Sequence, residues 1–175
     1  MIYFVRHGQT DFNLQSRIQG QLEVPLNEVG ISQAREIGES LKEVKFDKIY
    51  CSPLARTRQT AEIINEYHNI PIIYDDRLKE YCAGSRQGEC FLEWKTQEQP
   101  DLWDNETQKA CGAETFEEFQ TRVLSFYREL ETTKERVLIV SHGGVYRHIY
   151  RYLHNIKEKV KVQTLGNCEI VVFKK

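Results

Sequence analysis

Short apolar runs alternate with amphipathic segments along the chain, and the two kinds of segment have different periods. Runs rich in β-branched or aromatic residues are typical of strands, and we expect five, at residues 2–5, 48–51, 72–74, 136–140 and 169–173. Apolar residues three and four positions apart predict helices at about residues 31–44, 53–68, 116–134 and 145–154. This alternation predicts an α/β fold, a three-layer α/β/α sandwich with a mostly parallel central sheet.

Two of the expected helices have a recognisable start. Ser52 offers an N-cap hydroxyl and is followed by Pro53, which is favoured at the first helical position. Thr115 and Glu118 have the spacing of a capping box. We therefore expect one helix to begin directly after Ser52 and another directly after Thr115.

Between residues 75 and 112 the periodicity fades, and glycines and Pro100 interrupt a polar stretch that contains aromatic residues. We expect an excursion over the edge of the sheet, with a short helix near residues 91–97, where a substrate lid would lie. The 175 residues contain no repeat or linker and fit the usual size of one domain. A single domain over residues 1–175 is predicted.

Charge and cysteine content exclude several classes of protein. The 24 basic and 26 acidic residues leave a formal charge of −2, so no overall electrostatic attraction to nucleic acid or to an anionic membrane is expected. No secretory signal or membrane-spanning stretch is evident. Five cysteines without CxxC spacing are typical of reduced thiols. A cytoplasmic protein is predicted, and any specificity for anions must be local.

Two strands end in the same way, with His7-Gly8 after the first and His142-Gly143 after the fourth. Ligands of open α/β sheets bind outside the carboxyl ends of the strands, so the two imidazoles are expected at one site. The glycines would let backbone N–H groups approach an anion closely.

Two arginines suit such a site to phosphate. Arg6 precedes His7, and Arg56 lies near the start of a helix that follows a strand, where the helix dipole also favours an anion. A guanidinium holds two phosphoryl oxygens at once and stays charged. The cations should lower the pKa of His7 and keep it neutral, as a nucleophile must be. The attacking nitrogen is set by what the other one donates to, for which we expect a backbone carbonyl.

With these residues the chain resembles the histidine phosphatase superfamily, whose founding group is the phosphoglycerate mutases. The similar blocks follow the family order over nearly the whole chain: residues 6–8, 25–27 with Gly30 and 33–34, 52–61, Glu80 with Gly84 and Gly88, 112–115 and 140–143. The resemblance implies a phosphoglycerate mutase-like fold and a compact, metal-free phosphatase that needs no cofactor.

The resemblance also implies roles for individual residues. His7 would become phosphorylated while Arg6, Arg56 and His142 bind the transferring phosphoryl group, and Asn13 would help to hold it. Glu80 would protonate the leaving alkoxide and then take a proton from the attacking water. Residues 83, 86 and 87 depart from the family pattern around Glu80, so Glu89 is a substitute candidate. The remaining expected substrate contacts are Gly8, Gln19, Gly20 and Gly143.

These residues predict a phosphomonoesterase of the histidine acid phosphatase type that acts on a small phosphorylated metabolite. Phosphoglycerate mutase activity is the alternative, disfavoured because the mutases we compare are longer and shield their phosphohistidine. From other classes, His7, His142 and Glu80 could ligate a metal, or the protein could be a catalytically silent phosphate-binding module. The substrate stays open. A homodimer would form if the apolar strand at 170–173 pairs across a subunit edge.

Overall fold

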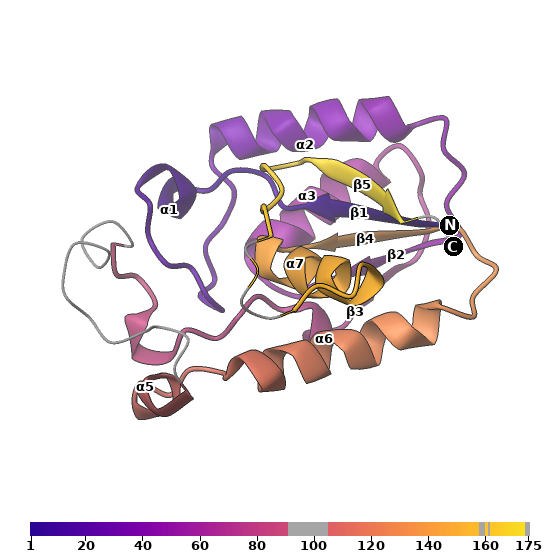
Figure 1. Cartoon of the computed structure of the whole chain (residues 1–175). Coiled ribbons are helices and arrows are strands. Elements are labelled where there is room, and N and C mark those ends of the chain that lie inside the picture. The colour runs from indigo at the N-terminus through magenta and orange to yellow at the C-terminus, as the bar shows by residue number, and fades with distance from the viewer. Residues whose placement is uncertain (91–104, 158–159, 161, 174–175) are drawn as a thin grey trace.

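Five strands form one sheet in the computed structural model, which describes residues 1–90, 105–157, 160 and 162–173 (Figure 1). Their order across the sheet is β3-β2-β4-β1-β5. The strands are β1 (Ile2–Arg6), β2 (Lys48–Cys51), β3 (Ile72–Tyr74), β4 (Val137–Ser141) and β5 (Ile170–Phe173). All neighbouring pairs are parallel except β1 and β5, which are antiparallel. The mostly parallel sheet is therefore confirmed, and β5 lies at its margin.

Helices cover both faces of this sheet. The helices are α1 (Asp11–Leu14), α2 (Glu28–Leu41), α3 (Ala55–Asn65), α5 (Asn105–Ala110), α6 (Phe116–Leu130) and α7 (Gly143–Leu153), with short 3-10 turns η1 (Asp76–Leu78) and η2 (Gly84–Arg86). Figure 1 shows α2 and α3 on one side of the strands and α6 and α7 on the other. The predicted three-layer α/β/α arrangement is present.

Alternating side chains of the central strands supply two apolar cores. Phe4 and Ile139 face α6 and α7, where they pack in a cluster with Phe126 and other buried residues. Val5 and Val140 face the opposite way and belong to the cluster beneath α2 and α3. Because β1 and β4 are apolar on both faces, they form the buried centre of the sheet.

The predicted helix starts have different outcomes. Thr115 caps α6 in a capping box with Glu118, as expected. The start at Ser52 is wrong, because α3 begins at Ala55 and its N-cap, Leu54, makes no side-chain cap hydrogen bond. The hydroxyl of Ser52 lies instead 2.8 Å from a ring nitrogen of His142. The hydroxyl also accepts from the Leu54 N–H at 3.5 Å, so its shorter contact is the tertiary one.

Other differences concern segment boundaries. Helix α2 begins at Glu28 rather than near residue 31, because the Asn27 side chain accepts a hydrogen bond from the Gly30 N–H and caps it. The described part of the excursion holds η1, η2 and α5, and the helix expected near residues 91–97 lies outside the described residues. Within the part that the structure describes, none of the helices has the length and apolarity needed to cross a membrane.

Candidate active site

His7 and His142 follow adjacent parallel strands and lie side by side. Arg6 at the end of β1 is in register with Ser141 at the end of β4, and the His7 N–H donates to the Ser141 carbonyl at 2.9 Å. The centroids of the two imidazole rings are 5.2 Å apart. Both side chains are buried. The topology of the sheet therefore brings together two histidines that are 135 positions apart in the chain.

The ring of His7 is held in one tautomer. Its Nδ1 lies 2.8 Å from the Gly8 carbonyl oxygen, and because a carbonyl can only accept, Nδ1 must carry the proton. The other nitrogen, Nε2, then keeps its lone pair. Burial, Arg56 and Arg6, in that order, hold the pKa of His7 well below its usual range, opposed by the bond to Gly8. A neutral imidazole with a free Nε2 is suited to nucleophilic attack.

Gly8 has a packing role rather than the expected role in anion binding. Its N–H donates to the Thr60 hydroxyl at 3.1 Å, so it does not face an open site. A Cβ at this position would lie 2.5 Å from the Gly30 carbonyl oxygen. The glycine is therefore needed because the loop after β1 packs directly on the backbone of α2.

The positive charges of Arg6 and Arg56 act on both histidines. Arg56 is fully buried, and among the described residues its side chain donates only to the carbonyls of Gly20, at 2.7 Å, and Leu22, at 2.9 Å. Arg6 donates to the Leu165 carbonyl. Within the part of the chain that the structure describes, the Nε of each guanidinium is buried without a partner. Among the described residues neither arginine forms an ion pair.

The electrostatics of Arg56 reflect this lack of a counterion. Burial lowers the pKa of its guanidinium to about 10, and the charges of Glu80 and Glu23 offset only part of the shift. Burial also lowers the pKa of Arg6, again with Glu80 acting in the opposite direction. Because an unpaired buried charge is costly, these two side chains form a site that would gain from a bound anion.

His142 lies next to His7 with one of its ring nitrogens free of any bond to the described residues. Its Nε2 is 2.8 Å from the Ser52 hydroxyl, and its Nδ1 is buried without a partner. Burial first, and then the charge of Arg56, hold the pKa of His142 well below its ordinary value. The residue is the N-cap of α7, but its side chain caps no backbone N–H. The ring is therefore available to an incoming group.

Gly143 begins α7 beside Arg6. A Cβ on Gly143 would meet the Thr164 hydroxyl at 2.4 Å and would lie 3.7 Å from the Nε of Arg6. The missing side chain leaves room for the Thr164 hydroxyl, and the unpaired Nε of Arg6 lies close to the amino end of the helix. Both features favour an anion at the same place.

Glu80 reaches the same helix end from another part of the chain. One carboxylate oxygen accepts from the Gly144 N–H at 3.1 Å, and the other accepts from the N–H of Tyr81 at 2.9 Å. Its charge acts on both Arg6 and Arg56. The substitute candidate Glu89 is exposed, and its carbonyl accepts from the Ile18 N–H. The geometry favours Glu80 as the acid near the histidines.

Asn13 is oriented by its neighbours and connects to His7 through a residue that the sequence did not indicate. Its side-chain oxygen accepts from the N–H and the hydroxyl of Thr10, each at 3.1 Å, and from the Asn167 amide at 3.3 Å. The same amide of Asn167 donates to the His7 carbonyl at 3.0 Å. Asn167 lies just before β5 in a segment without a motif, so no sequence signal could have found it.

Gln19 and Gly20 were expected to touch substrate. Gly20 instead supports the site from behind, because its carbonyl accepts from Arg56 and its φ of 50° suits a glycine. The side-chain oxygen of Gln19 is buried without a partner, which leaves it able to bind a donor.

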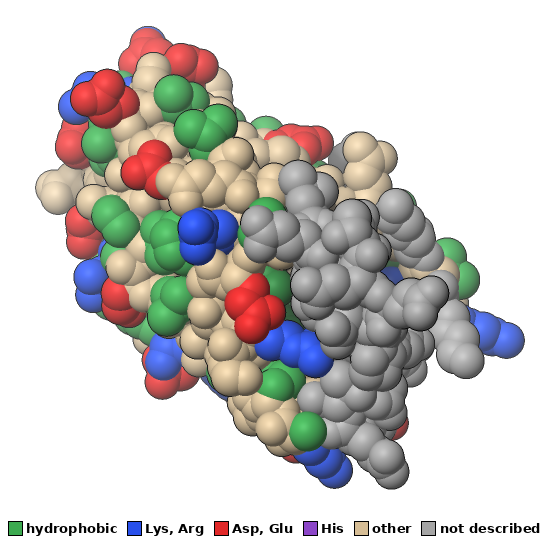
Figure 2. Space-filling view, turned by 90° about the vertical axis from the view of Figure 1, so that its left-hand side faces the viewer, with side chains coloured by type: hydrophobic (Ala, Val, Ile, Leu, Met, Phe, Trp, Pro, Cys, Tyr) green, Lys and Arg blue, Asp and Glu red, His purple; other side chains and the backbone are tan. Residues whose placement is uncertain are grey.

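A metal site does not form from these side chains. In the described ranges, no three His, Cys, Asp or Glu residues are grouped so that they could hold a metal ion. The alternative ligand set of His7, His142 and Glu80 is therefore not assembled. Figure 2 shows acidic and basic side chains mixed on the face at the left of Figure 1. The positive charge next to the two histidines comes from Arg6 and Arg56.

Comparisons with known proteins agree with this geometry. The model of the histidine phosphatase superfamily (branch 1) matches residues 2–174. An uncharacterised phosphatase, PhoE of Bacillus subtilis, is 41% identical over 146 residues, which are 82% of this chain and 72% of that protein. A metal-independent phosphoserine phosphatase of Arabidopsis thaliana is 38% identical over 161 residues, covering 85% of this chain and 66% of the relative. Further relatives are named as probable phosphoglycerate mutases.

Solved structures extend the likeness to three dimensions. A mycobacterial glucosyl-3-phosphoglycerate phosphatase superposes with a TM-score of 0.75 at 26% identity, covering 97% of this chain and 87% of that one. A phosphoglycerate mutase of Bacillus anthracis shares the fold, with a TM-score of 0.81 at 24% identity over 97% of this chain and 85% of its own. The expected phosphoglycerate mutase-like fold is confirmed.

Proposed function

The chain belongs to the histidine phosphatase superfamily, and we propose that it is a phosphomonoester hydrolase that acts through a phosphohistidine at His7. The substrate class is a small phosphorylated metabolite, because the relatives include phosphatases named for such compounds. The enzyme is of the histidine acid phosphatase type and works without a metal or cofactor. The phosphatase relatives support the general activity, and the arrangement of charge around His7 supports the mechanism.

One observation carries the proposal: a neutral, tethered His7 lies beside the buried Arg56 and the partly buried Arg6, and neither arginine forms an ion pair with a carboxylate of the described residues. A dianionic phosphoryl group would supply the missing counterion and occupy the unpaired Nε groups of Arg6 and Arg56. Phosphoryl transfer needs little covalent help from the protein, since positioning and neutralisation of charge dominate. The unpaired Nδ1 of His142 provides a further buried group toward the same phosphate.

In the first step, Nε2 of His7 attacks phosphorus opposite the ester oxygen. A P–N bond forms as the bond from phosphorus to the ester oxygen breaks, while Nδ1 of His7 keeps its proton and goes on donating it to the Gly8 carbonyl. The alkoxide that leaves takes a proton from the carboxylic acid form of Glu80. Arg6, Arg56 and His142 hold the equatorial oxygens during the transfer.

In the second step, water enters on the side that the alcohol has left. The ionised Glu80 now takes a proton from this water as its oxygen bonds to phosphorus, and the P–N bond breaks. Inorganic phosphate leaves, His7 regains its free Nε2, and Glu80 is again protonated. The same carboxyl group therefore serves once as acid and once as base.

The test is the loss of turnover and of the intermediate in His7→Ala. With a panel of phosphomonoesters, we expect this variant to release phosphate at least about 1000-fold more slowly than wild type. Quenched wild-type protein should carry an acid-labile phosphoryl group that the variant lacks. His154→Ala, at an exposed histidine, is the matched control. Comparable phosphate release from wild type and His7→Ala would overturn the mechanism. Release no faster than without protein in both cases would favour a silent binding module.

Mutase activity is the competing outcome, because some relatives are named as probable phosphoglycerate mutases. It would require the phosphohistidine to return its phosphoryl group to a bound phosphoglycerate rather than to water. We expect purified protein to release inorganic phosphate from 2- and 3-phosphoglycerate faster than it interconverts them. The reverse order of rates would replace hydrolase by mutase as the function.

A further inference from the structure

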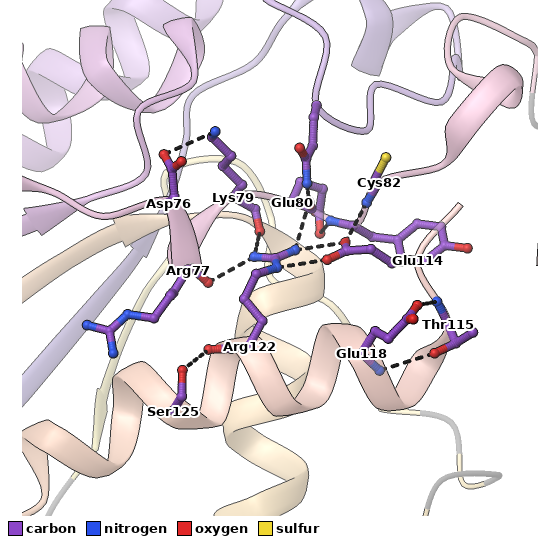
Figure 3. Close-up of polar contacts among 12 residues, drawn as sticks. Asp76, Arg77, Lys79, Glu80, Cys82, Glu114, Thr115, Glu118, Arg122 and Ser125 are labelled. Carbon is purple, nitrogen blue, oxygen red and sulfur yellow. Dashed lines mark hydrogen bonds and ion pairs between the residues drawn. The ribbon is translucent and has the colours of Figure 1, made fainter. Parts of the chain in front are cut away.

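Arg122 on α6 contacts the segment that carries Glu80 and uses every hydrogen-bond donor that it has (Figure 3). Its NH1 group donates to the carbonyls of Arg77 and Lys79, both at 2.9 Å, and its NH2 group donates to the Glu80 carbonyl at 3.3 Å. The remaining N–H groups of NH2 and Nε donate to the Glu114 carboxylate, both at 2.8 Å. An arginine has five N–H donors, so this one is saturated.

Glu114 holds the same segment on the other side of Glu80. The oxygen that accepts from NH2 of Arg122 also accepts from the Cys82 N–H at 2.8 Å. The backbone N–H of Glu114 donates to the Cys82 carbonyl at 2.9 Å. Glu114 and Arg122 thus bind the chain directly before, at and after the acid, as Figure 3 shows.

The carbonyl of Leu78 is also held by a side chain. The Ser141 hydroxyl, at the end of β4 next to His142, donates to it at 2.7 Å. The four consecutive carbonyls of residues 77–80 therefore all accept hydrogen bonds from side chains. Arg122 on α6 binds three of them and Ser141 on β4 binds that of Leu78. The Glu80 carbonyl also accepts from Gln21. The segment crosses the end of the sheet outside any strand, so these side chains supply the bonds that a ladder would have given.

From this arrangement we infer that Arg122 and Glu114 are positioning residues for the proton transfer of Glu80. The inference rests on the proposed function, in which Glu80 is the acid. The pair fixes the backbone on both sides of Glu80 and so holds its carboxylate against the Gly144 N–H at the start of α7. Neither side chain touches the phosphoryl group. Their effect should therefore appear in the protonation of the leaving group and not in phosphate binding.

The ion pair also explains why Arg122 does not act as a third phosphate ligand. Its charge is balanced by the bidentate Glu114, and both side chains are only 20% exposed. A lysine at this position would keep the charge but offer three donors in place of a planar fork of five. Geometry rather than charge is thus what Arg122 contributes.

The experiment compares kcat/KM for two substrates, because this ratio reports the step in which the alcohol leaves. Glycerol phosphate has a poor leaving group that needs a proton, whereas p-nitrophenyl phosphate has one that departs without it. We expect Glu80→Gln to lower kcat/KM for glycerol phosphate by about 100-fold and to affect the aryl substrate far less. Arg122→Gln and Glu114→Gln should show the same preference, with a loss of about tenfold or more for glycerol phosphate.

Two further variants separate positioning from general damage. In Glu80→Gln protein, adding Arg122→Gln should cause no further loss for glycerol phosphate, since there is no acid left to position. Arg77→Gln removes another ion-paired arginine of the same segment, whose side chain contacts Asp75 and Glu129 instead, and should leave the ratio between the substrates unchanged. Arg122→Lys and Glu114→Gln carry the test if Arg122→Gln does not fold.

The outcomes distinguish the two proposals. Equal losses for both substrates in Arg122→Gln, Arg122→Lys and Glu114→Gln, or losses that multiply with that of Glu80→Gln, would overturn the positioning role and leave the proposed function intact. If Glu80→Gln itself loses the same factor on both substrates, Glu80 is not the acid, and the inference fails together with that part of the proposed mechanism. If quenched wild-type protein carries no phosphohistidine, the proposed mechanism at His7 fails, and this result does not bear on how Glu80 is positioned.

Discussion

Arg122 and Arg56 are both enclosed by protein, but their surroundings differ in one respect. All five N–H groups of Arg122 have acceptors, and Glu114 balances its charge. Arg56 has two carbonyl acceptors and an unpaired Nε, and among the described residues it forms no ion pair although it is fully buried. Arg122, which shapes the site, has all its hydrogen bonds within the protein. Arg56, which faces the expected phosphate, does not.

This difference has an energetic meaning. A buried cation without a counterion destabilises the folded protein, whereas a saturated ion pair costs stability only when one partner is removed. Binding of an anion would complete the hydrogen bonds of Arg56 and balance its charge, and this contributes to the free energy of binding. Arg56 should therefore matter mainly for activity, and Arg122 for the structure around Glu80.

The largest expected effect is the loss of activity in Arg56→Met. Removing one donor aimed at developing charge typically costs about 100- to 1000-fold in rate, and Arg56 also binds the ground state, so we expect about 1000-fold in kcat/KM. The free energy of unfolding should change by less than about 1 kcal/mol, because relief of the buried charge offsets two lost hydrogen bonds. Steady-state kinetics and urea denaturation check the two parts. A strongly destabilised but active variant would reverse the comparison.

Arg122→Met should show the opposite balance in stability. The substitution removes the side-chain donor from the carbonyls of Arg77 and Lys79, and it removes the ion-pair partner from the Glu114 carboxylate. We expect the free energy of unfolding to fall by about 3 kcal/mol. Urea denaturation of wild type, Arg122→Met and Arg56→Met under one set of conditions gives the ranking. Equal stability of the two variants would show that saturation of the guanidinium does not distinguish these arginines.

A smaller effect separates Ser52 from Thr115, two hydroxyls that the sequence placed in the same capping role. Ser52→Ala should lower kcat about tenfold with little change in stability, because its hydroxyl lies against His142 rather than on α3. Thr115→Ala should cost about 1 kcal/mol of stability and leave kcat unchanged, since Thr115 does cap α6. A stability loss for Ser52→Ala as large as that for Thr115→Ala would restore the capping interpretation.

The smallest predicted effect concerns His148, a buried histidine outside the mechanism. Burial, then Arg147, Arg151 and Arg122, lower its pKa to about 3. Below pH 6.5 the unfolded chain takes up a proton that the folded protein does not, so stability is present above pH 6.5 and is lost as pH falls toward 3.

In His148→Leu, unfolding at low pH should take up one proton fewer than in wild type. At pH 6 the loss of stability, measured relative to pH 8, should be smaller than in wild type by about 0.8 kcal/mol. Activity at pH 8 should be unchanged, because the ring packs between Phe116 and Phe119 rather than in the site. An identical pH dependence in the two proteins would mean that folding does not shift the pKa of His148.

The sequence by itself determined the layer arrangement and the histidine motifs. Apolar runs such as 2–5 and 136–140 could only be buried strands, and parallel neighbours place the residues that follow them, His7 and His142, at one edge. These features depend on local periodicity and on a general rule of open α/β sheets, so they need no knowledge of distant contacts.

Only the tertiary structure decided what each polar group is bonded to. The Ser52 hydroxyl contacts His142 and does not cap α3, and Gly8 packs against the backbone of Gly30. Asn167, which binds the His7 carbonyl, lies in a segment without any motif. The contacts of Arg122 with the backbone around Glu80 likewise join segments more than forty positions apart. A hydrogen bond depends on distances of a few tenths of an ångström between such segments, and no local pattern in the sequence specifies those distances.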